Sequence, residues 1–542
     1  SPDLLDAFSQ RSGDSKIDVI VLLTDDATEK YQEAAIKSPS NLAKESSIVN
    51  LNDIINSNLS STKVSLEERL KRIEAKQAEI MENRSIAREI YSEHNTAVAQ
   101  KLAGFGEVIY ISEYSPVLIC NLTKSEALNV SRNDNVSYLV RGDIKLEDCA
   151  SSAYTNTNMQ FPYLLGYGGQ GIKIGMLEFG QPYMSNSVLA SLSDKITIQS
   201  TNVEVSAHAT AVASLMVDPN YGFAKGFEHL YSASCDTFSN MVLRIEWLLT
   251  QGANVINMSW GDNNSPNEYL SYAKWIDHIA YNHSVHIIVA SGNHGQNKVA
   301  LPAMAYNAIT VGAVDDINTP EYNDDVHWVY VGDTPGSNRE SAYNTIEDYP
   351  YKPDICSYGS NIFISSIGSA FNGTSFAAPQ IAGMVATLCS LEPELLTAMD
   401  LTKAILTCST LKSIHDYNTE DTGYHQHGAG IANALNATYL LNAGTYTSGH
   451  ISSTESRDAF SLGTFQKGET VTISLNFLKR TMFSGESHGN FAPEIDTPLP
   501  DLDIYIVPRV QMGVATFDKE LYANPNNYTY IYRSISANNN LE

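Results

Sequence analysis

Between residues 150 and 440, short apolar runs alternate with segments of helical character. The runs IKIGMLEFG, HLYSASC, ANVINMSWG, HIIVASGN, AITVGAV and FISSI are typical of buried strands, and segments such as SNMVLRIEWLLTQG between them are typical of helices. This alternation predicts an α/β fold with a doubly wound, parallel sheet. Ligands bind beyond the carboxyl ends of the strands in such sheets, so we expect the polar corners that end these strands to surround one cleft.

The segments on either side have a different pattern. The first 145 or so residues combine strand-like runs with a long stretch at 65–101 that lacks Gly and Pro, and they predict a small α+β unit. After Leu441, TFQKGETVTISLNF and LPDLDIYIVPRV alternate with period two and predict a C-terminal β-sandwich. We therefore expect three domains, at 1–148, 149–440 and 441–542.

Composition narrows the classes of function. The formal net charge of −27 disfavours nucleic-acid binding, because an acidic surface repels phosphate. We attribute the charge to the solubility of a secreted protein; the alternative is an acidic cleft that selects basic substrates. No apolar run approaches the roughly 20 residues of a membrane span. Without a CxxC pair, the six cysteines do not indicate a zinc or thioredoxin site, and we expect most of them to be buried thiols.

A serine in the segment NGTSFAAP is the first candidate for chemistry. Ser375 stands at the head of an apolar helical stretch, where a serine most often only caps the helix. A nucleophilic serine also needs a base, a group that orients the base, and donors for the oxyanion. Among 13 histidines, His208 has the most informative context, because it opens a helix of small residues in SAHATAVASLM.

Four segments together resemble the subtilisin-like serine proteases. NGTSFAAP followed by IAGMVA resembles the nucleophile segment of that family, and HATAVASL resembles its histidine segment, with Ala209 in place of the usual glycine. VHIIVASGNHG resembles the segment of the oxyanion asparagine, which maps to Asn293, and ANVINMSWG resembles the substrate-binding strand. The segments also follow the subtilisin order of acid, histidine and serine.

The resemblance implies a serine endopeptidase that acts on polypeptides. Ser375 would be the nucleophile, His208 the base and Asn293 an oxyanion donor. The substrate backbone would pair with a first segment, Ser259, Trp260 and Gly261. The specificity pocket would lie between this segment and a second one, Ala290, Ser291 and Gly292. The resemblance also implies secretion, no required cofactor, and calcium sites that clamp loops. Oxygen-rich pairs such as Asp315–Asp316 and Asp324–Asp325 exist, but we assign no metal ligand.

The acid departs from the family pattern. Where the family has Asp-Ser-Gly or Asp-Thr-Gly at the end of the first strand, this chain has Glu178. A glutamate can accept the imidazole N–H as an aspartate does, but its extra methylene requires a shift of about 1 Å, which can reduce the rate by about a hundredfold. In one interpretation Glu178 completes an active enzyme, which we favour. In the other, the chain is an impaired protease that binds peptides or regulates another protein.

The N-terminal unit resembles the family's inhibitory propeptide, and the C-terminal segment resembles small β-sandwiches appended to secreted bacterial proteases. We expect residues 1–148 to assist folding, block the cleft and be removed by self-cleavage between about Gly142 and Thr157. A permanent α+β domain is the alternative. The helix at 65–101 is longer than such a propeptide needs, and the sequence does not explain it.

Overall fold

A computed structural model provides the structure of the protein. It describes residues 4, 7–8, 15–24, 27, 30–31, 34, 66–142, 156–200, 202–262, 271–295, 299–317, 325–328, 336–338, 352–411, 427–448, 470–479, 517–519 and 529–537. Cys149, Asp324, the segment LPDLDIYIVPRV and most of the expected cleavage region lie outside these residues.

An eight-stranded sheet forms the centre of the molecule. Its strands are β5 (Lys173–Glu178), β6 (Ile196–Ile198), β7 (His229–Ser234), β8 (Val255–Met258), β9 (His286–Ala290), β10 (Ile309–Asp315), β11 (Val326–His327) and β12 (Ile355–Tyr358). The order is β11-β10-β9-β8-β5-β7-β6, with β12 also paired to β10. All pairs are parallel except β10–β11, which confirms the expected α/β fold with a mostly parallel sheet.

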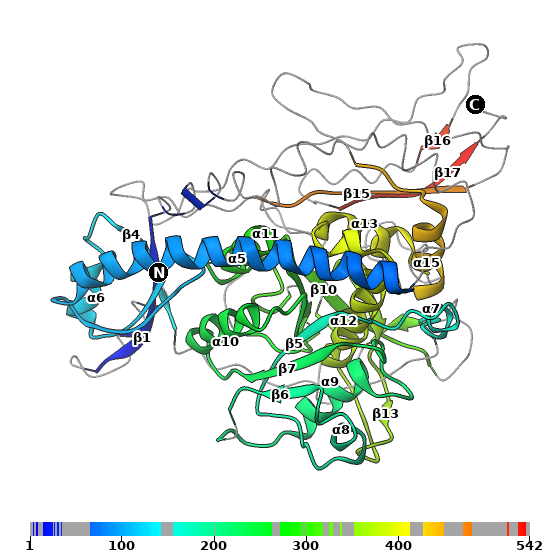
Figure 1. The fold of residues 1–542 in the computed structure, drawn as a ribbon, viewed down its shortest axis with the longest axis horizontal. Coiled ribbons are helices and arrows are strands. Elements are labelled where there is room, and N and C mark those ends of the chain that lie inside the picture. The colour runs from blue at the N-terminus through cyan, green and yellow to red at the C-terminus, as the bar shows by residue number, and fades with distance from the viewer. Residues whose placement is uncertain are drawn as a thin grey trace, which may run out of the picture.

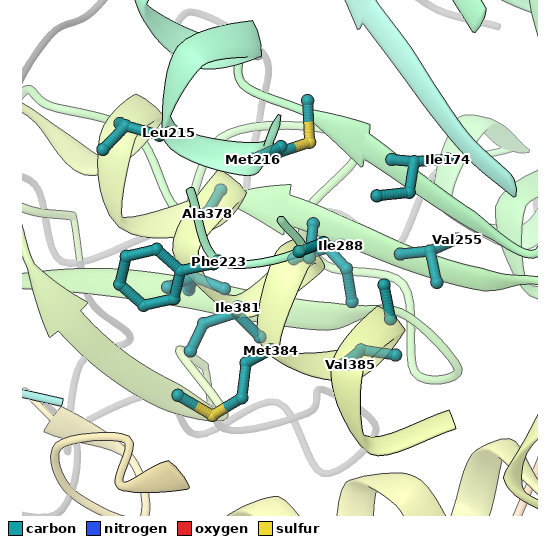
Figure 2. Close-up of a cluster of buried hydrophobic side chains, with 14 of the residues drawn as sticks. Ile174, Leu215, Met216, Phe223, Val255, Ile288, Ala378, Ile381, Met384 and Val385 are labelled. Carbon is teal, nitrogen blue, oxygen red and sulfur yellow. The ribbon is translucent and has the colours of Figure 1, made fainter. Parts of the chain in front are cut away.

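Helices cover both faces of this sheet. They are α7 (Gln160–Leu164), α8 (Ser187–Ala190), α9 (Ala207–Val217), α10 (Phe238–Thr250), α11 (Ser271–His283), α12 (Thr374–Leu391), η1 (Pro393–Leu396), α13 (Met399–Cys408) and α15 (Ala434–Ala443). Strand residues alternate between the two faces: Ile174 packs with α9 and α12, whereas Leu177 packs with α10 and α11. Figure 2 shows the first of these cores, where Met216 of α9 and Ile381 of α12 lie near Ile174 and Ile288 of the sheet.

The apolar helix α12 lies at the centre of this core. By length and composition it could cross a membrane, but all of its residues are buried inside the protein, as in the core helix of a globular domain. We found no second helix of this kind among the described residues. The sequence did not reveal α12 as a long apolar segment, because Gly, Ser and Thr interrupt its apolar residues.

The N-terminal unit has its own four-stranded antiparallel sheet. The strands β1 (Ile17–Leu23), β2 (Glu107–Ile111), β3 (Val117–Leu122) and β4 (Val136–Arg141) are arranged in the order β2-β3-β1-β4, with the helices α5 (Leu66–Leu102) and α6 (Lys124–Val130). One face of this sheet packs on α10 and α11, where Ile20 and Ile119 share a core with Val242 and Ile276. The long helix α5 runs across the larger unit (Figure 1).

One strand prediction needs correction. The run FISSI belongs to a separate hairpin, in which β13 (Ile362–Ile364) pairs with β14 (Ser369–Phe371), and not to the parallel sheet. In the C-terminal segment, β15 (Thr470–Asn476), β16 (Phe517–Lys519) and β17 (Thr529–Ala537) form an antiparallel sheet of order β15-β17-β16. This sheet agrees with a β-rich segment, and the β-sandwich remains a prediction.

Candidate active site

The carboxyl end of β5 and the first turn of α9 bring Glu178 and His208 together. Glu178 is the last residue of β5, and His208 lies in the first turn of α9, whose N-cap Ser206 accepts a hydrogen bond from the Ala209 N–H. The Glu178 Oε2 atom lies 2.9 Å from His208 Nδ1, with 0% of the glutamate side chain and 9% of the histidine side chain exposed. The other carboxylate oxygen, Oε1, accepts the Ser259 N–H at 3.2 Å. The buried carboxylate therefore has a partner on each oxygen.

Ser375 lies at the start of α12. The N-cap of this helix is Gly373, whose φ of 141° is rarely adopted by other residues. In this structure the Ser375 hydroxyl donates to the Ser259 carbonyl oxygen at 2.8 Å. A catalytic role would require this hydroxyl to turn toward His208, since catalytic hydrogen bonds often form fully only with substrate bound.

Asn293 is held with its amide in a defined orientation. It follows β9, and its Oδ1 accepts both the backbone N–H and the hydroxyl of Thr374 at 2.8 Å. Thr374 in turn accepts the Gly292 N–H at 3.1 Å through its Oγ1. Because Oδ1 is occupied, the Nδ2 group is the part of the amide that can donate to a ligand. The Ser375 N–H, in the first turn of α12, has no intrahelical acceptor and can be a second donor.

An aromatic pair packs beside His208, which the sequence did not lead us to expect. The Phe376 ring meets the His208 ring edge-on, with ring centres 5.2 Å apart. Phe371 stacks on Phe376 at 5.5 Å. The sequence has an aromatic residue directly after Ser375. Its contact with His208 can be recognised only in the folded structure. The pair limits rotation of the imidazole.

The two segments expected to bind substrate follow neighbouring strands. Residues 259–261 follow β8 and residues 290–292 end or follow β9, so the structure brings them side by side at the carboxyl edge of the sheet. All six residues are buried. The Trp260 side chain points into the core, where its indole N–H donates to the Leu177 carbonyl at 2.9 Å, so only its backbone can meet substrate. Behind this segment, Asp262 pairs with Leu301 through two backbone hydrogen bonds.

The acidic pairs named from the sequence are occupied by protein contacts. Asp316 accepts from Asn156 at 3.0 Å, and Asp325 accepts from the Tyr358 hydroxyl at 2.7 Å. Within the described ranges there is no group of three or more His, Cys, Asp or Glu side chains suited to a metal. We assign no step of the reaction to a metal. Cys120, Cys235, Cys356 and Cys389 are buried free thiols, while Cys408 is free and half-buried.

Comparison with known proteins agrees with this geometry. Residues 169–435 match the subtilase family, Peptidase S8. The chain is 30% identical to subtilisin DY of Bacillus licheniformis over 247 residues, covering 42% of this chain and 81% of that protein. It is 25% identical to an alkaline protease of Alkalihalobacillus alcalophilus over 349 residues, covering 61% of this chain and 82% of that protein.

Solved structures show a weaker likeness. The prenylagaramide maturation protease PagA has 21% identity and a TM-score of 0.42, with 52% of this chain and 98% of that chain covered. The patellamide maturation protease PatA has 24% identity and a TM-score of 0.40, with 51% and 98% covered. On the family match and the similarity to subtilisin DY, the chain belongs to the subtilase family of serine proteases.

Proposed function

We propose that this subtilase is an endopeptidase that cleaves peptide bonds through an acyl-enzyme, with Glu178 as the acid of its triad. The observation that carries the proposal is the 2.9 Å approach of the buried Glu178 carboxylate to His208 Nδ1. A carboxylate in this position selects the tautomer with a proton on Nδ1, which leaves Nε2 free to accept the serine proton. It also stabilises the imidazolium that forms during the reaction.

The reaction would proceed in two halves. Ser375 Oγ attacks the scissile carbonyl as His208 takes its proton, and the resulting oxyanion is held by Asn293 Nδ2 and the Ser375 N–H. His208 then gives the proton to the leaving amine, and the acyl-enzyme forms. Water, activated by the same histidine, releases the acid product and restores Ser375.

The structure suggests how the longer acid is accommodated. Glu178 Oε1 is tied to the Ser259 N–H at 3.2 Å while Oε2 faces His208. The two contacts hold the carboxylate from both sides, so the extra methylene does not leave the group mobile. We infer that the end of β5 absorbs the added length.

We also propose that the specificity pocket lies between residues 259–261 and residues 290–292. Gly292 has a φ of 102° and donates its N–H to Thr374, so the backbone there approaches the oxyanion site closely. A larger residue at Gly292 should change which side chain is accepted before the cleaved bond. Digestion of a peptide library tests this placement, and an unchanged cleavage pattern would refute it.

Self-processing is the next part of the proposal. The N-terminal unit docks on α10, where Glu246 accepts hydrogen bonds from Ser112 and Tyr110. At its end, the Gly142 carbonyl accepts the N–H of Ser239, at the start of α10. That point lies at the carboxyl edge of the sheet, where the catalytic residues are. We propose that the segment after Gly142 enters the cleft, is cut there and remains bound as an inhibitor.

Secretion and a second candidate function complete the proposal. Secretion is suggested by the net charge of −27 and by family resemblance, and recovery of activity from the medium of an expressing culture would test it.

The second candidate function, an impaired subtilase that binds peptides or regulates another protein, is favoured by one observation. The Ser375 hydroxyl donates to the Ser259 carbonyl in this structure.

Expression of the wild type beside Ser375→Ala decides between the two functions. We expect the wild type to split into fragments of about 16 and 43 kDa, judged from domain length, and the alanine variant to remain whole. A fluorophosphonate probe should label Ser375 in the processed wild type only. A folded wild type that neither splits nor takes up the probe would favour the impaired protein.

A further inference from the structure

The long helix α5 contacts the sheet at the edge opposite the catalytic residues. Gln77 donates to the Gly171 carbonyl at 2.6 Å and to Asn254 Oδ1 at 3.2 Å. Gly171 lies two residues before the start of β5, and Asn254 directly precedes β8. Glu178 and Ser259 lie at the opposite ends of the same two strands. The helix can therefore stay in place without occupying the catalytic cleft.

A single arginine of α5 occupies a socket made by two helix ends. Arg84, which is 1% exposed, donates to the carbonyl oxygens of Leu249 at 3.0 Å, Ala253 at 2.9 Å and His283 at 3.2 and 3.3 Å. These carbonyls lie at or just beyond the C-termini of α10 and α11, where helices have unsatisfied acceptors and the negative end of their dipole. A guanidinium satisfies several such acceptors at once.

Among the described residues, no carboxylate pairs with the charge of Arg84. The partners of the guanidinium are the backbone carbonyl groups of the socket. Burial lowers the pKa of Arg84 to about 10, so the side chain is still a cation at neutral pH. Its stabilisation must come from the oriented carbonyl groups. Separation of the N-terminal unit would expose this cation and remove the bonds that cap both helices.

Apolar and ionic contacts extend the interface along the helix. Ile73 and Ile80 are buried in the same core as the central sheet. Lys76 lies 2.9 Å from Glu394 of η1, directly after the helix that carries Ser375. Helix α5 is thus integrated with the catalytic unit over several turns, beyond the surface that the N-terminal sheet covers.

We propose that cleavage between the two units does not release the N-terminal unit, because α5, anchored by Arg84 in the carbonyl socket, holds it as a noncovalently bound second chain. This inference rests on the proposed self-processing and deepens it. It also assigns a role to the helix that exceeds the needs of an inhibitory propeptide: the helix binds the amino edge of the sheet, and only the connecting segment needs to leave the cleft.

The test separates docking from catalysis. The full chain carries Ser375→Ala and a recognition site for a site-specific protease within residues 143–155, so an added protease makes the cut. After cutting and dilution, size-exclusion chromatography and native mass spectrometry measure whether the fragments stay together. We expect a one-to-one complex, and immediate separation of the fragments would overturn the proposal.

Variants then test the socket. Arg84→Met should weaken the cut complex at least about a hundredfold, since several charge-assisted hydrogen bonds are lost. The matched control is Arg88→Met on the same helix, because Arg88 pairs with Glu113 inside the N-terminal unit at 2.7 Å, and it should change the affinity less than about threefold. Equal affinities for the two variants would contradict the role of Arg84.

A second variant protects the test against misfolding. If Arg84→Met does not fold, which near-ultraviolet circular dichroism of the uncut chain will show, Gln77→Met replaces it, with an expected loss of about tenfold. No loss with Gln77→Met would then count against the proposal. A failure of the proposed function gives a different result: the wild type would not cut itself, while the externally cut complex would still be intact.

Discussion

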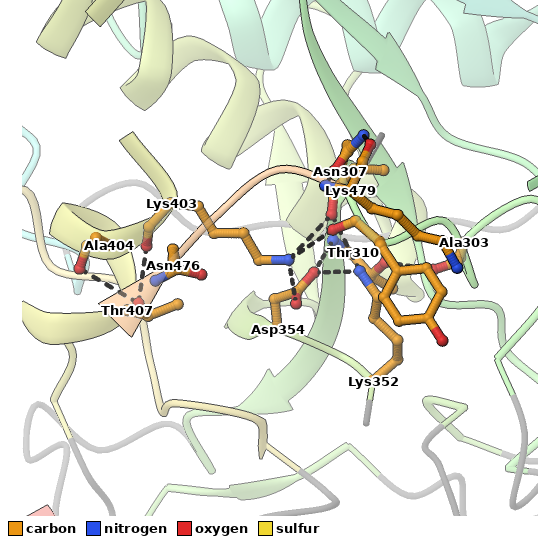
Figure 3. Close-up of polar contacts among 12 residues, drawn as sticks. Ala303, Asn307, Thr310, Lys352, Asp354, Lys403, Ala404, Thr407, Asn476 and Lys479 are labelled. Carbon is orange, nitrogen blue, oxygen red and sulfur yellow. Dashed lines mark hydrogen bonds and ion pairs between the residues drawn. The ribbon is translucent and has the colours of Figure 1, made fainter. Parts of the chain in front are cut away.

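The two edges of the central sheet both contain buried charged groups, but they use them differently. At the carboxyl edge, Glu178 faces His208, and Thr374 holds the Asn293 amide through its Oδ1 atom, which leaves the Nδ2 group to donate. At the amino edge, near the first residues of β10 and β12, Asp354 lies between Lys352 and Lys403 (Figure 3). Both edges pair a buried carboxylate with a basic group.

Every polar atom of the amino-edge cluster is occupied by the protein. Lys352 Nζ lies 2.6 Å from Asp354 Oδ2 and donates to the Ala308 carbonyl at 3.0 Å. Lys403 Nζ lies 2.6 Å from Asp354 Oδ1 and donates to the Tyr306 carbonyl at 3.1 Å. Asp354 Oδ2 also accepts the Thr310 N–H at 2.7 Å. The cluster ties together segments that meet at this edge.

The difference teaches which buried ion pairs are suited to chemistry. In the proposed reaction, His208 keeps one nitrogen on the Glu178 carboxylate and uses the other to accept the Ser375 proton, so this pair changes its protonation. At the amino edge, both lysines and the aspartate are fixed by backbone groups, so any change of charge acts on stability. Substitutions should therefore alter activity at one edge and folding at the other.

The largest effect is expected from Glu178→Gln. Glutamine keeps the size of the side chain but loses the charge that stabilises the imidazolium, and its amide can favour the wrong tautomer of His208. We expect kcat to fall by about ten-thousandfold, or about 5 kcal/mol in transition-state stabilisation, with little change in thermal stability. Steady-state kinetics on a peptide substrate measures it. Turnover equal to that of the wild type would remove Glu178 from the catalytic group.

Asp354→Asn should produce the opposite pattern. Removing the carboxylate leaves the two buried lysines without an anion between them, which should lower the free energy of unfolding by about 3 to 5 kcal/mol. Activity per folded molecule should be unchanged. Urea unfolding in the Ser375→Ala background measures the loss, and the exposed Asp236→Asn is the control with an expected change below about 0.5 kcal/mol. Loss of activity at full stability would mean that the two edges are coupled.

The two edges were also unequally predictable from the sequence. Each motif of the carboxyl edge is local: Asn293 stands in SGN, Ser375 in NGTS, and strand order places such corners together. The amino edge has no such local signal. Lys352 and Lys403 are 51 residues apart by number, and only the pairing of β10 with β12 brings Asp354 to Thr310. The strand β12 is too short for its periodicity to have been recognised.

The role of α5 could not be predicted from the sequence, for a similar reason. Its lack of Gly and Pro predicted a long helix, and α5 spans Leu66–Leu102. Nothing in the sequence shows that Arg84 is buried while Arg88, one turn later, lies near the surface. Their difference depends on the ends of α10 and α11, whose arrangement follows from the whole fold.

Glu178→Asp should have a smaller effect than Glu178→Gln. Aspartate keeps the negative charge but withdraws it by one methylene from a site whose Ser259 and His208 contacts fit a glutamate. We expect kcat to fall by up to about a hundredfold, or about 2.7 kcal/mol. The kinetics of the two variants, measured together, separate charge from reach. An aspartate variant as slow as the glutamine variant would show that reach, and not charge, is limiting.

The smallest effect concerns the pH dependence of stability at the amino edge. Burial lowers the pKa of Lys352 to about 7, although the neighbouring Asp354 opposes this shift. In the unfolded chain, a lysine has a pKa near about 10.4. Between these values the unfolded state binds more protons than the folded state, so this group makes the folded state more stable as pH rises, by at most about 1.4 kcal/mol per pH unit.

Lys352→Met isolates this contribution. Methionine retains most of the buried volume and cannot titrate, and Lys403 remains paired with Asp354 at 2.6 Å. Urea unfolding of both proteins in the Ser375→Ala background, from about pH 7 to about pH 9, gives two stability curves whose difference reports Lys352 alone. We expect the curve with lysine to rise relative to the curve with methionine. Parallel curves would mean that Asp354 holds the Lys352 charge through this range. The amino edge would then be insensitive to pH, unlike the carboxyl edge, where His208 changes its charge in the proposed reaction.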